Sequence, residues 1–342
     1  MGIGFGLWIE PEMVNEDSDL FRAHPDWAVG IPGRPRTESR HQLVLDLSRP
    51  EVVDHLVEVL TDLLRSAPIA YVKWDFNRFL TEPYSTALPP ERQGEFKHRF
   101  ALGLYDLWRR VTAPFPDILF ESCSGGGGRY DPGLLAFAPQ VWTSDDTDAI
   151  ERLAIQWGTS IAYPLSTMAA HTSAIPNHQV GRTASLATRS AVAFFGVFGY
   201  ELDPRALSDD ERAEIRAQVA WYLARRELFQ FGRFVRLRSP FDGDGNETAW
   251  AVLSDDRRRA IVGHYRVLSR PVPKRDRLVL RGLDPEATYR ITVWPDGGDV
   301  TISRSGAELL GVGLPIEPSD PFPARPNRDF TARLFDLEAV AD

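Results

Sequence analysis

Short apolar runs alternate with longer amphipathic stretches over the first two thirds of the chain. Residues 50–66 place Val and Leu at helical spacing, with Pro50 in the first turn, and the apolar run 69–75 that follows is typical of a strand. In the stretch 208–229, Ser208 and Glu211 have the spacing of a helix N-cap and its capping box. The same patterns predict further strands at 4–9, 117–122, 140–146, 161–167 and 193–200, and further helices at 91–111 and 149–158.

Strands that alternate with helices predict βαβ units and a mostly parallel sheet. The strands are almost continuously apolar, which indicates burial on both faces, and a polar cluster follows each one. A (β/α)8 barrel or an open α/β sheet builds its active site at these carboxyl ends. About six such strands are present, and a complete barrel needs eight. Because the chain opens directly on a strand, we expect the other two to lie upstream of residue 1.

The last hundred or so residues change to a different pattern. Strands expected at 248–254, 259–266, 277–280 and 289–293, with a turn at 282–288, have the spacing of an antiparallel β-sandwich. The Pro-rich stretch 318–326 is typical of an irregular connection. We therefore predict an incomplete (β/α)8 barrel over residues 1–234 and a β-sandwich domain over 235–342.

Composition excludes several classes of partner. With 39 Lys+Arg against 48 Asp+Glu, the net charge is −9, which argues against a nucleic-acid-binding or polybasic membrane-binding surface. No apolar run approaches the roughly 20 residues of a membrane-spanning helix, and residues 1–12 lack the pattern of a secretory signal. The single cysteine, Cys123, cannot form an intramolecular disulfide or a multi-cysteine metal site and favours a cytoplasmic location.

The first candidate site lies in the segment 71–78, at the end of a predicted strand. Lys73 and Asp75 are two positions apart, so their side chains point to the same side of that strand. A neighbouring cation favours the ionised form of a carboxylate, which is the form that a carboxylate nucleophile requires. A structural salt bridge at the strand end is the alternative interpretation.

The second candidate is the cluster Asp145, Asp146 and Asp148, just after another strand. Carboxylates this close raise the pKa of at least one member, which suits a general acid. Helix capping is one alternative, with Asp148 as the expected cap. Calcium binding is another, but the spacing lacks the Gly and Glu positions of an EF-hand loop.

The third candidate is the glycine cluster 125–128, which follows a strand and Cys123. Because the Walker Gly-Lys-Ser/Thr ending is absent, an ATP site is not expected, and glycine instead allows a small polar ligand to approach the backbone closely. Cys123 lacks the context of a nucleophile, and packing in the core is its alternative role. Trp8 and Trp142, at strand ends, could stack on a sugar or pack in the core. Arg40 is one of several loop arginines that are solvated by default.

Taken together, these residues resemble glycoside hydrolase family 36, the microbial α-galactosidases. The resemblance covers nearly the whole chain and rests on several motifs in order: Gly6-Leu-Trp-Ile-Glu-Pro-Glu-Met13, His24-Pro-Asp-Trp27, Gln42-Leu-Val-Leu-Asp-Leu-Ser48, Lys73-Trp-Asp-Phe-Asn-Arg78, Glu121-Ser-Cys-Ser-Gly-Gly-Gly-Gly-Arg129 and Trp142-Thr-Ser-Asp-Asp-Thr-Asp148.

The resemblance implies a retaining α-galactosidase that acts on oligosaccharides such as melibiose and raffinose without a metal or other cofactor. It implies that Asp75 is the nucleophile and Asp145 the general acid/base. Family members often form oligomers, so a homo-oligomer is compatible with it. The galactose subsite that it implies consists of Trp8, Arg40, Lys73, Asn77, Cys123, Gly125 and Trp142.

The chain departs from the family pattern at its front, where members carry a β-sandwich, the first two barrel strands and an Asp-Asp pair that grips galactose. We therefore expect an open barrel edge and weak or absent activity of the 342-residue polypeptide alone, which robust turnover of an aryl α-galactoside would contradict. Two alternatives stay open: an α-N-acetylgalactosaminidase or galactosyl transferase on the same scaffold, and a non-catalytic galactose-binding remnant.

Overall fold

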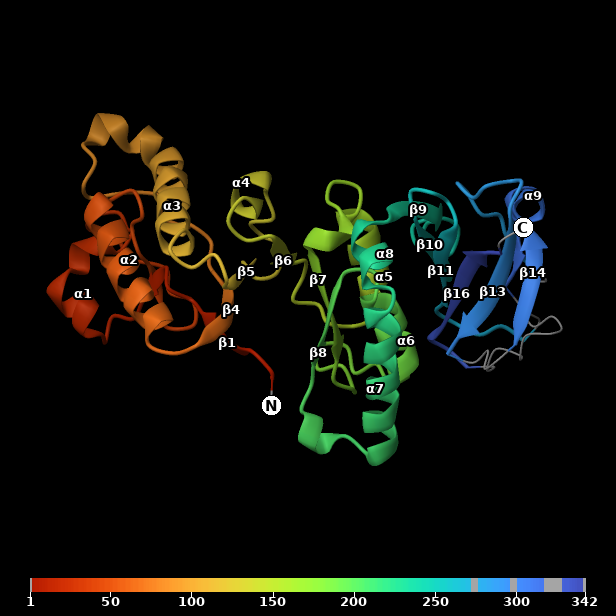
Figure 1. Ribbon diagram of the computed structural model, residues 1–342. Helices are drawn as coiled ribbons and strands as arrows, with labels where there is room; N and C mark the ends of the chain where they lie inside the picture. Colours follow the sequence, from red (N-terminus) through yellow and green to blue (C-terminus); the bar gives the residue numbers. More distant parts are fainter. Residues whose placement is uncertain (1, 272–275, 296–299, 317–327, 341–342) are drawn as a thin grey trace. The chain divides into compact units, whose positions relative to one another are not determined.

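The chain divides into two units, residues 1–145 and 146–342, which are described separately. A computed structural model describes residues 2–271, 276–295, 300–316 and 328–340. Six strands have parallel partners, which confirms the incomplete barrel (Figure 1). These strands are β1 (Phe5–Ile9), β4 (Ile69–Trp74), β5 (Leu119–Ser122) and β6 (Gln140–Trp142) in the first unit, and β7 (Met168–Ser173) and β8 (Val197–Glu201) in the second.

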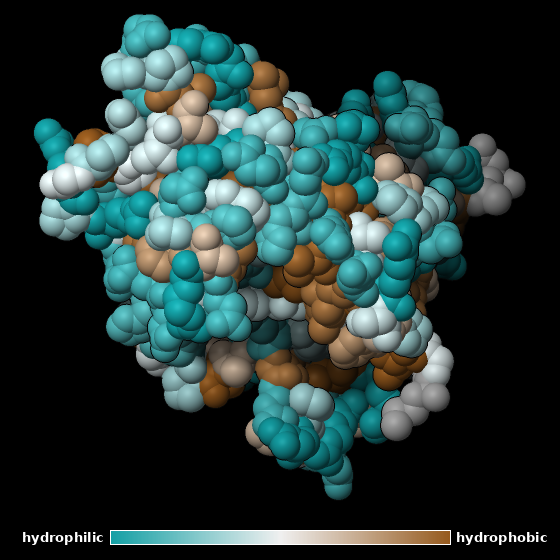
Figure 2. All heavy atoms as spheres, turned by 90° about the vertical axis from the view of Figure 1, so that its left-hand side faces the viewer, coloured by the Kyte–Doolittle hydropathy of each residue, from teal (hydrophilic) through white to brown (hydrophobic). Residues whose placement is uncertain are grey.

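In the first unit, helices connect strands in the order β1, β4, β5, β6. Pro50 opens the long helix α2, whose apolar stripe is buried, and the next long helix places Trp108 against Trp74 with ring centroids 4.2 Å apart. The face that carries these helices is mainly hydrophilic (Figure 2). The helices are α1 (Asp19–Ala23), α2 (Pro50–Arg65), α3 (Phe96–Thr112) and α4 (Pro132–Leu135), and β2 (Met13–Val14) pairs with β3 (Leu43–Val44).

In the second unit, β7 and β8 pair in parallel, and four helices accompany them. The capping box predicted for Ser208 and Glu211 is confirmed at the start of α7. Asp148 accepts hydrogen bonds from the backbone amides of Ile150 and Glu151 at 3.0 and 3.1 Å, so it caps the turn that leads into α5, whereas the N-cap position of the helix itself is Ile150. The helices are α5 (Glu151–Thr159), α6 (Leu186–Ala193), α7 (Asp209–Leu223) and α8 (Arg226–Phe231).

The end of the chain forms an antiparallel sandwich around one apolar core. Its large sheet has the order β14-β13-β16-β11-β10-β9, and the pair β12–β15 with helix α9 contributes Leu278, Leu309 and Leu314 to the same core. The elements are β9 (Arg233–Arg238), β10 (Glu247–Leu253), β11 (Arg259–Arg266), β12 (Arg277–Leu278), β13 (Thr288–Trp294), β14 (Thr301–Ser305), α9 (Gly306–Gly311), β15 (Leu314–Pro315) and β16 (Thr331–Ala339). The predicted Pro-rich connection 318–326 lies outside the described residues.

The expectation that the first strand is buried is wrong. Phe5 and Trp8 of β1 are 52% and 51% exposed. β1 stands at the end of its sheet and pairs with β4 alone among the described strands, so one side of it lacks a covering neighbour. Its apolar residues are therefore accessible on the surface of the first unit.

Three other element predictions need correction. Residues 161–167 are not a strand; they form a turn and the 3-10 helix Leu165–Thr167, and the strand β7 comes directly afterwards. β7 reads Met-Ala-Ala-His-Thr-Ser, and these small buried side chains give a weak apolar signal. The run 193–200 begins as the end of α6, and the helix predicted for 208–229 is divided into α7 and α8. Among the described helices, none combines the length and apolar character needed to cross a membrane.

A buried carboxylate in the sandwich predicts acid sensitivity. The neighbouring His264, whose Nε2 lies 3.7 Å from Oε2, lowers the pKa of Glu247 to about 2, against the effect of burial, and Arg238 adds to the lowering. In the unfolded chain, the pKa of the Glu247 carboxyl is about 4.3. The ionised carboxylate therefore stabilises the folded chain fully above that pH, and this stabilisation is lost as the pH falls toward 2. After discounting for solvent screening, we expect this carboxylate to contribute about 1–2 kcal/mol to the free energy of unfolding.

Urea unfolding of the chain and of Glu247→Gln at pH 6 and pH 3 measures this contribution. The variant should lose about 1–2 kcal/mol at pH 6 and about half as much at pH 3. Asp255→Asn, at an exposed carboxylate, is the control. An equal loss in Glu247→Gln at both pH values would contradict the assignment.

Candidate active site

Asp75 stands directly after β4, and its carboxylate is the centre of a hydrogen-bond network. Oδ2 accepts hydrogen bonds from the Trp8 indole Nε1 at 3.1 Å and from Asn77 Nδ2 at 2.8 Å. Oδ1 accepts a hydrogen bond from the backbone amide of Phe76 at 2.8 Å. The residue is 6% exposed. Trp8 lies on β1 opposite Lys73 of the neighbouring strand β4, and Phe76 and Asn77 belong to the segment that directly follows β4.

The network keeps Asp75 ionised. Burial raises the pKa of this carboxyl, but hydrogen bonds from Asn77, Cys123, Trp8 and the Phe76 amide outweigh burial and hold the pKa below its usual value. A buried, ionised carboxylate with fixed donors is the arrangement that a carboxylate nucleophile requires. The sequence had suggested a cation as the cause of ionisation, whereas the hydrogen bonds come from neutral groups.

Lys73 pairs with a carboxylate other than Asp75. Its Nζ lies 3.3 Å from Glu121 Oε1 and 4.8 Å from the centre of the Trp142 ring. The salt bridge considered for Lys73 and Asp75 is therefore wrong, and Glu121, which is fully buried and also accepts a hydrogen bond from Gln140 at 2.6 Å, is the partner. The pairing register of β4 and β5 sets Lys73 opposite Glu121.

Cys123 and Gly125 lie beside the Asp75 network. The Cys123 thiol is 1% exposed and shares a hydrogen bond with Asp75. Burial raises the pKa of this thiol strongly, and the charge of Asp75 raises it further, so the thiol stays protonated and is a donor rather than a nucleophile. A side chain at Gly125 would begin 3.8 Å from Asn77 Oδ1, which places this glycine next to the same network.

Glu10 connects Arg40 to the site. Its carboxylate accepts a hydrogen bond from Asn77 Nδ2 at 2.7 Å and lies 3.5 Å from Arg40 Nη1. Arg36, another arginine of the same loop, donates to the Pro25 carbonyl at 2.9 Å. Glu10 was not among the residues predicted for the site, although its position directly after β1, equivalent to that of Asp75 after β4, is the signal that could have identified it.

The two tryptophans proposed as sugar platforms differ in exposure. Trp8 is 51% exposed, as expected for an accessible aromatic face. Trp142, the last residue of β6, is 3% exposed, so the expectation of an open face is wrong for it in the described structure. The ammonium of Lys73 lies over its ring and accounts for part of this cover.

Asp145 follows β6 by three positions and has an exposed side chain. Its backbone packs against the glycine loop: a Cβ at Gly126 would lie 2.8 Å from Asp145 N and 2.6 Å from Ser144 Cα. Cys123, three positions before Gly126, contacts Asp75. The short segment 123–126 therefore lies beside both Asp75 and the backbone of Asp145. Among the described residues, no group of His, Cys, Asp and Glu side chains is arranged to hold a metal ion.

This close approach predicts that replacing Gly126 by any other residue lowers activity. Gly126→Ala would need backbone displacement and a left-handed conformation, since φ is +82°. We expect roughly a tenfold or larger loss of kcat, equivalent to about 1.4 kcal/mol, from displacement of Asp145. Gly94→Ala, where a Cβ meets nothing within 4 Å, is the control. Equal kinetics of the two variants would contradict the contact.

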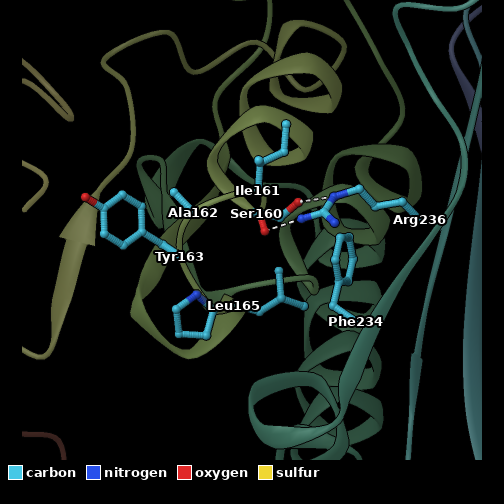
Figure 3. A pocket seen from close by; sticks show the side chains of 8 residues that line it. Ser160, Ile161, Ala162, Tyr163, Leu165, Phe234 and Arg236 are labelled. Carbon is cyan, nitrogen blue, oxygen red and sulfur yellow. Dashed lines mark hydrogen bonds between the residues drawn. The ribbon is translucent and has the colours of Figure 1, made fainter. Parts of the chain in front are cut away.

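A hollow in the second unit is a different kind of site (Figure 3). Arg236 Nε donates to Ser160 Oγ at 3.0 Å, and Phe234 and Tyr163 line the same hollow. None of its eight lining residues, all of them described, is acidic. It therefore lacks the carboxylates that hydrolysis by two acids requires.

Comparison with known families matches both parts of the chain. A family model described as Melibiase matches residues 1–232, and one described as Glycosyl hydrolase family 36 C-terminal domain matches residues 247–337. The chain is 54% identical to α-galactosidase AgaA of Geobacillus stearothermophilus over 99% of its length, and 45% identical to α-galactosidase 1 of Pediococcus pentosaceus over 100%. It spans 44% of the length of each relative.

Solved structures give the same result. The crystal structure of AgaA matches with a TM-score of 0.91 at 51% identity, covering 99% of this chain and 45% of AgaA. The α-galactosidase from Lactobacillus brevis matches with a TM-score of 0.93 at 47% identity, covering 100% of this chain and 45% of that structure.

Proposed function

We propose that this chain, which belongs to the melibiase family of glycoside hydrolases, family 36, carries the catalytic site of an α-galactosidase that acts with retention of configuration. The observation that carries the proposal is the Asp75 carboxylate, buried yet held ionised by Trp8, Asn77 and Cys123. An anionic carboxylate with fixed donors can attack the anomeric carbon of a bound galactosyl group.

In the proposed reaction, Asp75 is the nucleophile and Asp145 the general acid/base. Asp145 protonates the departing glycosidic oxygen while Asp75 bonds to C1, and Asp145 then removes a proton from the water that releases galactose. A retaining enzyme needs its two carboxyl groups about 5–5.5 Å apart. Two contacts of segment 123–126 support this arrangement: Cys123 contacts Asp75, and Gly126 packs against the backbone of Asp145.

The spacing of aspartates in a relative also supports these roles. Two structures of the Geobacillus enzyme hold raffinose and stachyose, and each has one aspartate replaced, by asparagine in the first and by alanine in the second. The two replaced aspartates are separated by the same number of residues as Asp75 and Asp145. We propose oligosaccharides that end in α-galactose as the substrates of this chain as well.

The sugar-binding role of the surrounding residues is part of the same proposal. The exposed face of Trp8 suits stacking on a galactose ring, and Lys73, Asn77 and Arg40 supply donors for its hydroxyl groups. Cys123 and Trp142 are buried behind these residues, against Asp75 and Lys73, and with Gly125 they are proposed to back the sugar-binding wall.

We also propose that residues 1–234 carry the catalysis and that residues 235–342 form a separate β-sandwich domain. The family matches to residues 1–232 and 247–337 support this boundary. A reducing compartment such as the cytoplasm is proposed from the buried, free thiol of Cys123. A homo-oligomer stays an expectation of the family resemblance.

The experiment is a panel of aryl α-glycosides with proton NMR of the first-formed sugar, run on this chain joined to the front part of the family pattern, because weak or absent activity is expected of the 342 residues alone. The proposal expects hydrolysis of the α-galactoside with α-galactose as the initial product. Preference for the N-acetylgalactosaminide, or transfer to a second sugar, would support the other enzymes on this scaffold. Galactose binding in calorimetry without hydrolysis would support a non-catalytic protein and contradict the proposal.

A further inference from the structure

Glu12 and Arg129 form a buried ion pair that the proposed mechanism does not use. Glu12 is fully buried, and the Arg129 side chain is 15% exposed. The guanidinium binds both carboxylate oxygens, with Nη1 2.8 Å from Oε2 and Nη2 2.9 Å from Oε1. This two-point geometry fixes the plane of both groups more firmly than a single contact would.

Each member of the pair also contacts a neighbour of Asp75. Glu12 Oε1 accepts a hydrogen bond from the Trp74 indole Nε1 at 2.9 Å. The Arg129 guanidinium carbon lies 4.7 Å from the centre of the Phe76 ring. The pair therefore holds the residue before Asp75 and the residue after it.

The backbone around Asp75 is where this restraint has its effect. The Phe76 amide donates to Asp75 Oδ1, and the Phe76 carbonyl accepts a hydrogen bond from Ser124 Oγ at 2.9 Å. The Trp74 carbonyl accepts one from the Cys123 amide at 2.8 Å. Rotation of either neighbour would move the donors that fix the carboxylate.

We propose that the Glu12–Arg129 ion pair is a positioning device for the nucleophile, which aims the Asp75 carboxylate by holding Trp74 and Phe76. The inference rests on the proposed function, because it takes Asp75 as the nucleophile. Both residues are positioning residues and touch no substrate.

A purely stabilising role is the competing interpretation. Replacing a buried ion pair by apolar side chains of similar size often leaves stability unchanged, whereas removing one partner leaves an uncompensated buried charge. The double variant Glu12→Leu/Arg129→Met is therefore expected to fold while losing the two-point contact. Arg129→Lys, which keeps the positive charge but cannot bind both carboxylate oxygens of Glu12 at two points, is the second variant.

The test follows the titration of Asp75 by NMR of chains labelled with ¹³C at the aspartate side-chain carboxyl, with Asp75→Asn to assign the signal. In both variants we expect the midpoint to rise by about one pH unit, a tenfold change in the ionisation constant. We also expect kcat for an aryl α-galactoside to fall roughly tenfold or more, with KM changed less than threefold.

The matched control is a second buried ion pair, Arg225 and Asp336 in the second unit, where the side chains are 20% and 4% exposed. Arg225→Met/Asp336→Leu should leave the Asp75 midpoint unchanged. An unchanged midpoint in both Glu12–Arg129 variants, or an equal shift in the control, would overturn the inference. Absence of turnover in the chain joined to the front part of the family pattern would count against the proposed function alone, since the titration needs no turnover.

Discussion

In this chain joined to the front part of the family pattern, hydrolysis of an aryl α-galactoside is expected to fall by roughly 10⁴-fold or more in Asp75→Ala, because the covalent intermediate can no longer form. Azide should enter the space left by the carboxylate, attack C1 from the opposite side of the leaving group and restore turnover. The product of this rescue is β-galactosyl azide, with inverted configuration. Rates with and without azide, and NMR of the azide product, measure the effect.

Asp117→Ala is the matched control for this variant, since Asp117 is an exposed carboxylate in the same unit. It should retain normal kinetics and gain nothing from azide. Unchanged turnover in Asp75→Ala would remove Asp75 from the mechanism.

The second large effect is expected in Asp145→Ala, and it should depend on the leaving group. Melibiose and raffinose need a proton on the departing oxygen, so their hydrolysis should fall by roughly 10²–10⁴-fold. A dinitrophenyl galactoside leaves without that proton, so its first step should be nearly normal. The galactosyl intermediate should then accumulate, and azide should release it as α-galactosyl azide, with retained configuration.

The opposite configurations of the two azide products distinguish the two roles. A β-azide from Asp145→Ala, or an equal loss for all leaving groups, would contradict its assignment as acid/base. The acid limb of kcat/KM adds a check on Asp75, whose pKa is held below its usual value by Asn77, Cys123, Trp8 and the Phe76 amide despite burial. Activity should therefore be lost only as the pH falls through that lowered pKa.

The sequence was sufficient to place Asp75, because a polar residue that ends an apolar strand reaches the carboxyl edge of a parallel sheet. It was not sufficient to identify the partners of that residue. Glu12 and Arg129 are 117 positions apart, and Lys73 meets Glu121 only through the register of two strands. Such pairings are set by tertiary structure and have no local pattern.

Exposure and boundaries were also hard to predict, for different reasons. The apolar pattern of β1 is that of a buried strand, yet the strand stands at the end of its sheet, where an open barrel edge was expected from the departure from the family pattern, and Phe5 is open. β7 was missed because its small side chains are buried without a strong apolar signal. The sandwich strands β9 and β16 were not predicted, although β16 lies between β11 and β13 in the large sheet.

The most direct measurement of the two-aspartate site is peptide mass spectrometry of Asp145→Ala quenched during turnover of a dinitrophenyl α-galactoside. If Asp75 is the nucleophile and Asp145 serves the second step, the galactosyl group should be found attached to Asp75. A galactosyl group on another residue, or none despite release of dinitrophenol, would contradict the proposed site.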